Sequence, residues 1–264
     1  MNKPERTAIM ISGGGSTMEA VLKAPIPGIE VVLVIATKLD AGGIGLAVKA
    51  GMPERNVVVM RKRDYSSEEA YADRLIKLLD EYHVTLLCLL GCLVRIPDKV
   101  IRHLKGRVLN QHPGPLDTAV EHYDFGGDGM HGKRVHAARL LFVAQSSVEP
   151  LTYATVHWIA PAAEAGGKPE YDRGVVVGEE RVVIPPQFVL AAGEGDSGLK
   201  WAADKLQMLV LPREHALVKE TLRRVAEGPL KPIVHEPHWL VQPGQKSLLD
   251  KCKRKALELY PPGK

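Results

Sequence analysis

The segment VLNQHPGPLDTAV, residues 108–120, places two polar side chains at the end of an apolar run. Asn110 and His112 lie two residues apart, and two prolines follow them. Because successive side chains of a strand point to opposite faces, both groups would point to one side where the strand ends. Ligands of open α/β sheets bind beyond the carboxyl ends of the strands. The two residues are therefore either a ligand-facing pair or the cap of a strand that runs into a turn.

A second candidate is the glycine-rich stretch ISGGGSTMEAVL, residues 11–22. Glycine lets the backbone turn sharply and approach a ligand, and the N–H groups at the start of a helix attract a phosphate. The dinucleotide fingerprint requires a small residue where Met18 stands, and the lysine of nucleotide-hydrolase phosphate loops is absent. The stretch therefore favours a monophosphate over a dinucleotide.

Two carboxylates are less distinctive. Asp172 in PEYDRGVVV precedes a strand-like run beside a glycine, which by itself is typical of a turn. Glu214 and His215 in PREHALV begin a helical pattern, where a glutamate ordinarily complements the helix dipole. Neither segment alone indicates a site.

The elements that must position these residues alternate in the first half of the chain. Strand-like runs at residues 7–11, 31–36, 56–60, 84–90 and 107–111 are separated by helical patterns at residues 16–24, 45–50, 66–83 and 97–103. This alternation predicts a parallel sheet with helices on both faces.

The second half follows a different pattern. A glycine-rich loop leads into a predicted helix at residues 133–144, and two strand-like runs, at residues 151–160 and 174–185, are expected to pair like a hairpin. A helix is predicted around residues 206–227. The apolar stripe of KSLLDKCKRKALELY predicts a terminal helix at residues 246–260 that docks on the body of the protein.

Composition narrows the class of protein. The 264 residues are 45% hydrophobic and 25% charged, as in soluble globular proteins, and the net charge of +4 favours small anions more than nucleic acid. No apolar stretch approaches the ~20 residues of a membrane span, and we expect a cytoplasmic protein with no membrane partner. The three cysteines, Cys88, Cys92 and Cys252, are expected to be free thiols, with no disulfide framework and no metal site.

Taken in order, six segments of the chain resemble the folate-dependent phosphoribosylglycinamide (glycinamide ribonucleotide) formyltransferase family, from about Thr7 to Trp239. The segments are ISGGGST, LLGCLVRIP, LNQHP, FGGDGMHGKRVHAA, YATVHWI with EYDRGVVV, and REHALV. The resemblance implies a Rossmann-like α/β fold, with a mostly parallel twisted sheet flanked by helices on both faces and an antiparallel portion toward the C-terminus. It also implies a formyltransferase domain at residues 1–232, with a phosphate-binding half at 1–110, a folate and catalytic half at 111–232, and a tail at 233–264.

The resemblance implies that a formyl group moves from 10-formyltetrahydrofolate to the amine of glycinamide ribonucleotide in purine biosynthesis. Asn110 and His112 would donate hydrogen bonds to the oxyanion of the tetrahedral intermediate. Asp172 would keep His112 charged and help to carry the proton from the amine to the folate nitrogen. No metal would be needed.

The remaining roles implied by the resemblance concern binding. Gly14, Gly15, Ser16 and Thr17 would hold the phosphate, with Thr17 where the family usually has asparagine. Glu214 would contact the glycinamide end, and the pterin would lie against the backbone of Leu93, Val94 and Ile96. His136 would support the site from behind or simply pack on the sheet. The partners would be small molecules, and the protein would be a monomer or a homodimer.

The sequence departs from the family pattern at two apparent insertions, around residues 114–125 and 161–169, which leave the amine acceptor in doubt. Polar residues near the first insertion, His122, Asp124, Asp128 and His131, are expected to form a solvated loop rather than a metal site. Alternatives are formyl transfer to an amino sugar nucleotide or an aminoacyl-tRNA, hydrolysis of formyltetrahydrofolate, or a nonenzymatic ligand-binding module on the same fold.

Overall fold

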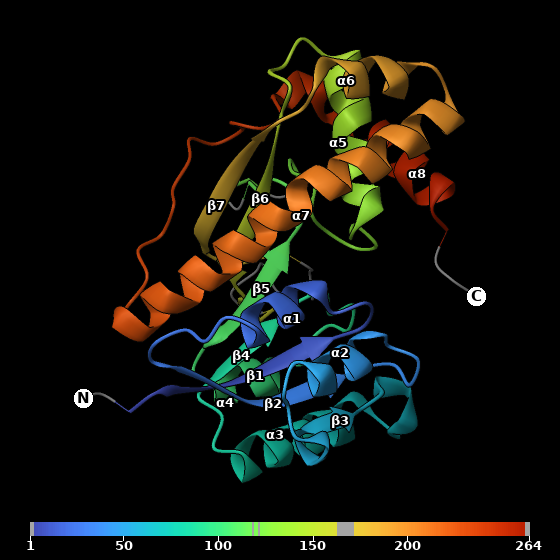
Figure 1. Cartoon of the computed structure of the whole chain (residues 1–264). Helices are drawn as coiled ribbons and strands as arrows, with labels where there is room; N and C mark the ends of the chain where they lie inside the picture. The colour runs from blue at the N-terminus through green and yellow to red at the C-terminus, as the bar shows by residue number, and fades with distance from the viewer. Residues whose placement is uncertain (1–2, 118, 121, 163–171, 262–264) are drawn as a thin grey trace.

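A computed structural model describes residues 3–117, 119–120, 122–162 and 172–261, and these residues form one seven-stranded sheet in the order β3-β2-β1-β4-β5-β6-β7 (Figure 1). The strands are β1 (Glu5–Ile11), β2 (Ile29–Ala36), β3 (Val57–Val59), β4 (Leu86–Leu89), β5 (Val108–His112), β6 (Leu151–Trp158) and β7 (Val176–Val183). The first five strands are parallel, whereas β6 is antiparallel to β5 and to β7. The predicted fold class is confirmed, including its antiparallel C-terminal portion.

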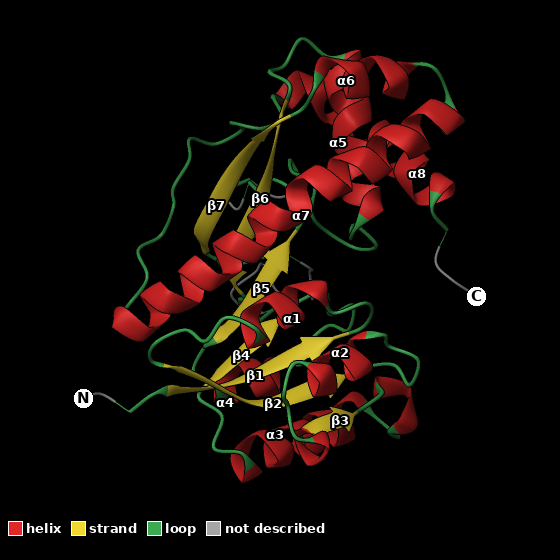
Figure 2. Ribbon diagram, in the orientation of Figure 1, coloured by secondary structure: helices red, strands yellow, loops and turns green. Residues whose placement is uncertain are grey.

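Helices cover both faces of this sheet (Figure 2). They are α1 (Ser16–Leu22), α2 (Gly43–Lys49), α3 (Glu68–Glu81), α4 (Asp98–His103), α5 (Lys133–Gln145), α6 (Pro186–Gly193), α7 (Asp196–Glu227) and α8 (Lys246–Leu259). Strand β1 explains the two layers, because Ala8 and Met10 pack with α3 and α4, whereas Ile9 and Ile11 pack on the side of α1, α5 and α7. A strand that is buried on both faces must be apolar throughout.

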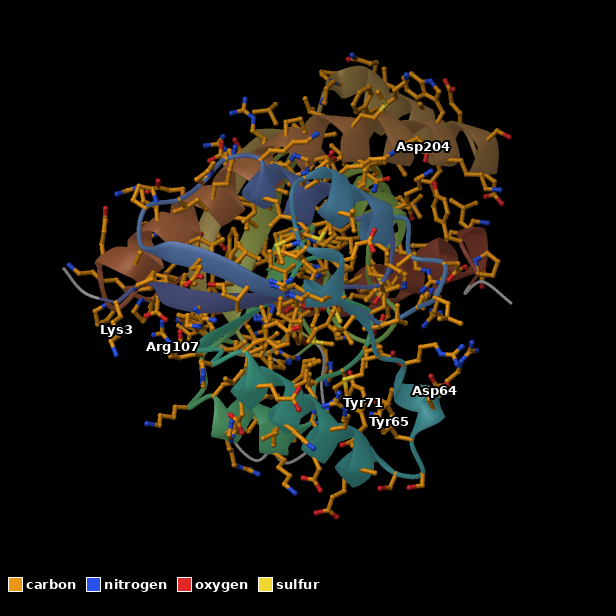
Figure 3. All side chains as sticks on the ribbon, turned by 60° about the horizontal axis from the view of Figure 1, so that its bottom comes forward. Lys3, Asp64, Tyr65, Tyr71, Arg107 and Asp204 are labelled. Atoms are coloured by element: carbon orange, nitrogen blue, oxygen red, sulfur yellow. The ribbon has the colours of Figure 1, made fainter. Side chains whose placement is uncertain are left out.

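The layer under α3 shows how side chains close one face of the sheet. Tyr71 of α3 is fully buried and meets the ring of Tyr65 edge to face, with 5.4 Å between the ring centroids (Figure 3). Ser67 caps the helix by accepting a hydrogen bond from the backbone N–H of Ala70. The cap explains why α3 begins two residues later than the sequence predicts.

The helix predicted around residues 206–227 begins ten residues earlier, at Asp196, and α6 was not predicted. Its buried residues recur every three or four positions along the whole length, from Leu199 through Leu206 and Val210 to Val225. This stripe packs on β6, β7 and α1, and the packing carries the helix through Pro212. The predicted terminal helix is confirmed as α8, which lies against α5.

The loops that follow β1 and β4 leave the sheet in neighbouring positions, because β1 pairs with β2 on one side and with β4 on the other. This reversal of strand order is the place where open α/β sheets bind ligands. Among the described helices, none is long and apolar enough to cross a membrane.

Candidate functional site

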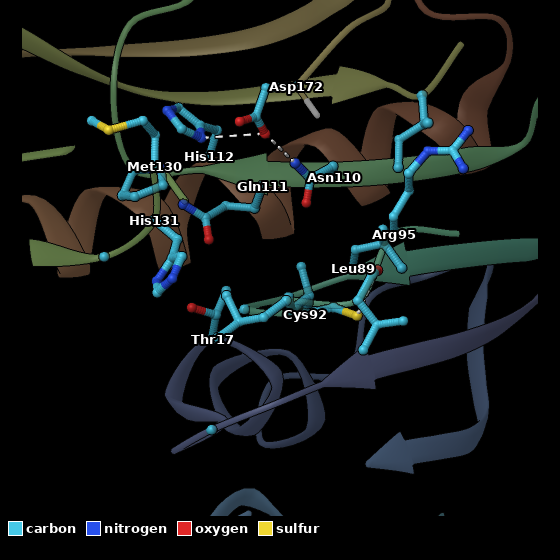
Figure 4. Close-up of a pocket in the computed structure, with 18 of the residues that line it drawn as sticks. Thr17, Leu89, Cys92, Arg95, Asn110, Gln111, His112, Met130, His131 and Asp172 are labelled. Atoms are coloured by element: carbon cyan, nitrogen blue, oxygen red, sulfur yellow. Dashed lines mark hydrogen bonds and ion pairs between the residues drawn. The ribbon is translucent and has the colours of Figure 1, made fainter. Parts of the chain in front are cut away.

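A cavity of about 520 Å³ opens at the carboxyl ends of β1, β4 and β5, with α7 as a further wall. Figure 4 looks into this cavity. All but one of the residues predicted for the site line it, namely Gly14, Gly15, Ser16, Thr17, Leu93, Val94, Ile96, Asn110, His112, Asp172 and Glu214. The exception is His136.

His112 and Asp172 form a buried charge pair. His112 Nδ1 lies 3.4 Å from Asp172 Oδ1, and the side chains are 2% and 9% exposed. Burial lowers the pKa of His112, but Asp172, with smaller contributions from Asp124 and the backbone of Phe125, outweighs burial and raises it. Burial also opposes ionisation of Asp172, yet the charge of His112 holds the pKa of Asp172 well below its usual range. The pair therefore consists of an imidazolium and a carboxylate, and His112 Nε2 has no hydrogen-bond partner among the described residues.

Asn110 is bound on two sides. Its Nδ2 lies 3.1 Å from Asp172 Oδ1 and 3.0 Å from Nε2 of His157, which stands opposite Asn110 in the pairing of β5 with β6. His157 Nδ1 lies 3.1 Å from the carbonyl oxygen of Trp158, so Nδ1 carries the proton and Nε2 accepts from Asn110. Both N–H groups of the Asn110 amide are therefore engaged.

The backbone around Asp172 fixes its carboxylate in this place. Asp172 has φ 58°, in the left-handed region that aspartate and asparagine tolerate better than most residues. The following segment pairs with the end of β6, and a Cβ on Gly174 would lie 1.9 Å from the carbonyl oxygen of Trp158. Asp172 Oδ2 accepts a hydrogen bond of 3.0 Å from the backbone N–H of Gly127. Asp172 and Gly174 therefore form a turn, and Asp172 also supplies the carboxylate of the site.

The glycine-rich stretch turns between β1 and α1 as expected from the sequence. Gly15 is the N-cap of α1 with φ 71°, and a Cβ there would lie 2.8 Å from the Cα of Gly43. A Cβ on Gly14, in contrast, would have open space around it. Gly15 therefore shapes the loop, whereas Gly14 presents free space to the cavity.

The loop after β4 supplies an apolar wall. Leu93 and Ile96 both line the cavity; Leu93 is 39% exposed, whereas Ile96 is buried. The backbone N–H of Leu93 donates to Ser12 Oγ at 2.7 Å, and Ser12 N–H donates to the carbonyl oxygen of Gly91 at 3.0 Å. Ser12 thus ties the two ligand loops together, and the N–H of Leu93 is already engaged.

Glu214 lies in the wall that α7 contributes, 5% exposed. Burial raises its pKa to about 7, against the opposing effects of His112 and Gln111. Gln111 also lines the cavity, although its neighbours Asn110 and His112 point to the other face of β5. The end of β5 therefore offers both faces to the cavity.

Sequence reasoning missed Gln111, Ser12 and His157. Gln111 and His157 lie inside the segments LNQHP and YATVHWI, and the only signal was the presence of a polar side chain in a strand that should be apolar.

His136 lies in α5 and is completely buried, without a hydrogen-bond partner for either ring nitrogen among the described residues. Burial first, and then the charge of His112, lower its pKa to about 3. His136 is therefore neutral and close enough for the charge of His112 to lower its pKa, but it does not line the cavity.

The polar residues of the first apparent insertion do not form a uniformly solvated loop. Asp124 is 3% exposed and accepts the backbone N–H groups of Asp117 and Gly126, whereas Asp128 is exposed at the cavity. His131 lies 3.0 Å from Arg134. Within the described part of the chain, no cluster of ligating side chains suits a metal ion. Most of the second apparent insertion, residues 163–169, lies outside the described residues.

Comparison with known proteins agrees with this architecture. Residues 5–117 match the family described as "Formyl transferase". A chloroplastic phosphoribosylglycinamide formyltransferase of Arabidopsis thaliana is 27% identical over 230 residues, which cover 86% of this chain and 67% of that protein. A trifunctional purine biosynthetic protein of Gallus gallus is 29% identical over 61% of this chain, and the match spans only 14% of its length.

Solved structures give the same result. The phosphoribosylglycinamide formyltransferase of Brucella melitensis has a TM-score of 0.63 at 28% identity, over 88% of this chain and 100% of that one. A glycinamide ribonucleotide transformylase of Symbiobacterium toebii shares the fold, with a TM-score of 0.66 at 24% identity over 89% and 92% of the two chains. Residues 5–117 of the chain thus match the formyl transferase family, and the chain has the fold of the phosphoribosylglycinamide formyltransferases.

Proposed function

We propose that the protein is a phosphoribosylglycinamide formyltransferase, which moves the formyl group of 10-formyltetrahydrofolate to the amine of glycinamide ribonucleotide. The proposal rests on the buried His112–Asp172 pair in the wall of the cavity. The glycine-rich loop at residues 13–17 lines one part of this cavity, and the apolar wall at residues 93–96 lines another. The relatives of known structure carry this name.

In the proposed reaction, the amine nitrogen attacks the formyl carbon, and the carbonyl oxygen becomes an oxyanion. His112, kept protonated by Asp172, would donate to this oxygen from Nε2, a buried atom without a partner among the described residues, and so supply the stabilisation that acyl transfer requires. The bond between the formyl carbon and the folate nitrogen then breaks. The proton lost by the amine passes to that nitrogen, with the Asp172–His112 pair as the relay.

Asn110 serves this reaction only after a local change, because both of its N–H groups are engaged. Releasing Asp172 frees one N–H for the oxyanion, while the bond to His157 keeps the amide in place. We therefore assign His112 as the ready donor and Asn110 as the second donor.

The two ends of the cavity suit the two substrates. Gly14, Gly15, Ser16 and Thr17 would hold the ribonucleotide phosphate at the start of α1, and the wall formed by Leu93, Val94 and Ile96 would take the pterin. His136 would support His112 from behind. The division at residues 110 and 232, the small-molecule partners, the absence of a nucleic-acid partner, a monomeric or dimeric state and a cytoplasmic location stay predictions. The Arabidopsis relative is named as chloroplastic.

Replacing Glu214 with glutamine should stabilise the fold but weaken substrate binding. The folded pKa of Glu214, about 7, lies above the ordinary glutamate value of 4.5, so ionising it in the folded protein costs about 3 kcal/mol at pH 8. This penalty grows as the pH rises from 4.5 to 7 and is absent at lower pH. Glu214→Gln should therefore raise the melting temperature at pH 8 and leave it nearly unchanged at pH 4.5.

The same Glu214→Gln variant should bind the ribonucleotide at least ~10-fold more weakly, because the neutral amide oxygen is a weaker acceptor than a carboxylate toward a donor group of the substrate. Thermal unfolding at two pH values and a steady-state KM measure both effects. A variant with wild-type KM would remove Glu214 from the substrate site.

Product analysis tests the proposed function directly. The protein is mixed with 10-formyltetrahydrofolate and, in separate reactions, with glycinamide ribonucleotide, an amino sugar nucleotide, an initiator aminoacyl-tRNA or no acceptor. We expect formylation of glycinamide ribonucleotide alone. Formylation of another amine, or release of formate without an acceptor, would replace the proposal with the corresponding alternative.

A further inference from the structure

The C-terminal helix α8 contacts the second glycine-rich loop, residues 126–132, which lies between β5 and α5 beside the site. More than a hundred residues separate this loop from α8 in the chain. Lys253 of α8 donates a hydrogen bond of 2.7 Å from Nζ to the carbonyl oxygen of Gly126, and its side chain is only 17% exposed. Arg134 makes a second tie, donating to the carbonyl oxygens of Gly129 at 2.8 Å and Tyr260 at 2.7 Å. The loop is therefore anchored to the end of the chain.

The anchored carbonyl belongs to one particular peptide group. The carbonyl of Gly126 and the N–H of Gly127 are the two ends of the same planar unit, and that N–H donates to Asp172 Oδ2 at 3.0 Å. Because the unit is planar, fixing its oxygen also fixes the direction of its N–H. A cation at the oxygen also polarises the unit and strengthens its N–H as a donor.

The fit around this peptide leaves little freedom. A Cβ on Gly126 would lie 2.9 Å from the Cβ of Asp172, so the loop backbone packs directly against the site carboxylate. Asp124 Oδ1 accepts the N–H of Gly126 at 3.0 Å and lies 4.0 Å from Lys253 Nζ. Asp124 and Lys253 thus hold the two polar groups of Gly126 and neutralise each other.

We propose that Lys253 is a positioning residue for Asp172, acting through the peptide group between Gly126 and Gly127. Helix α8 is then part of the machinery of the site. The consequence for turnover rests on the proposed formyl transfer, whereas the link from Lys253 to the Gly127 amide does not.

The test compares Lys253→Met and Lys253→Arg with a matched control, Lys251→Met, which removes an exposed lysine from the same helix. Lys253→Met should lower kcat roughly 10-fold or more, as expected for the loss of a charge-assisted hydrogen bond, with small changes in both KM values. Arginine keeps the charge and the donor, so Lys253→Arg should recover most of the turnover. The control should behave as the wild type.

Hydrogen exchange of the Gly127 amide, followed by NMR in the unliganded protein, provides a readout that does not depend on activity. Lys253→Met should accelerate this exchange at least ~10-fold relative to amides in β1, because the peptide group is no longer held in the orientation that directs its N–H to Asp172. Unchanged exchange at Gly127 in a folded Lys253→Met protein would overturn the proposal. Faster exchange in a protein that transfers no formyl group would support it and count against the proposed function alone.

A double variant separates positioning from charge balance. Lys253→Met removes one of the cations that face the buried Asp124 and leaves Arg173 as another, and this loss can lower stability by itself. Asp124→Asn together with Lys253→Met removes that charge. If kcat stays low and Gly127 still exchanges quickly, Lys253 acts on the peptide as proposed. A return of both to wild-type values would reduce Lys253 to a counterion and overturn the proposal.

Discussion

Replacing Asp172 with asparagine should lower the turnover of formyl transfer by ~100-fold or more, the size of effect seen when an oxyanion donor is lost. Asparagine has the same shape and tolerates the positive φ of 58° at this position, so the backbone is preserved. What changes is the charge beside His112. Without the carboxylate, burial is opposed only by Asp124 and the backbone of Phe125, so the pKa of His112 should fall.

A neutral His112 that keeps its proton on Nδ1 presents a lone pair at Nε2, and a lone pair cannot stabilise an oxyanion. The loss of charge on His112 should therefore be visible as a shift in the pH profile of activity. In the wild type, activity should fall as the pH rises through the raised pKa of His112, and in Asp172→Asn that fall should move to lower pH. The imidazole pKa measured by NMR checks the cause independently.

The control is the pair of variants His112→Ala and Asp172→Asn/His112→Ala. Residues that act as a unit are not additive, so the double variant should be little slower than His112→Ala. Fully additive losses, or an unchanged pKa of His112 in Asp172→Asn, would show that the two side chains do not cooperate.

Strand alternation made one part of this site predictable. Asn110 and His112 share a face of β5, and both approach Asp172 Oδ1, at 3.1 and 3.4 Å. The distance from either residue to Asp172 was not predictable from periodicity, because it depends on the close pairing of the Asp172 segment with the end of β6. Resemblance to a family, rather than pattern, pointed to that aspartate.

The residues that the sequence did not reveal are those whose neighbours come from distant segments. His157 faces Asn110 only because β6 pairs antiparallel with β5, and Lys253 faces Gly126 only because α8 docks on α5. The early start of α7 has the same origin, since contacts with the sheet stabilise helical turns that contain glycine and a proline. Tertiary packing decided each of these, and local propensity carries no information about it.

Gly14→Asp should raise the apparent KM for the ribonucleotide roughly 100-fold, because a carboxylate facing a phosphate costs several kcal/mol. Gly14 suits this test better than Gly15. A side chain at Gly15 would meet the Cα of Gly43 at 2.8 Å and require a positive φ, so it would distort the loop whatever its charge. A Cβ at Gly14 has open space and still faces the cavity.

The matched control is Gly14→Asn, which has nearly the same volume as Gly14→Asp and no charge. We expect it to raise the ribonucleotide KM by only a small factor, and we expect both variants to leave the KM for 10-formyltetrahydrofolate close to wild type. Steady-state kinetics with each substrate varied in turn, and calorimetric titration of each ligand, provide the comparison. Equal losses for asparagine and aspartate would mean that space rather than a phosphate charge limits this loop. Equal weakening of both substrates would mean that the loop shapes the whole cavity, and the proposed division into a phosphate end and a pterin end would then be wrong.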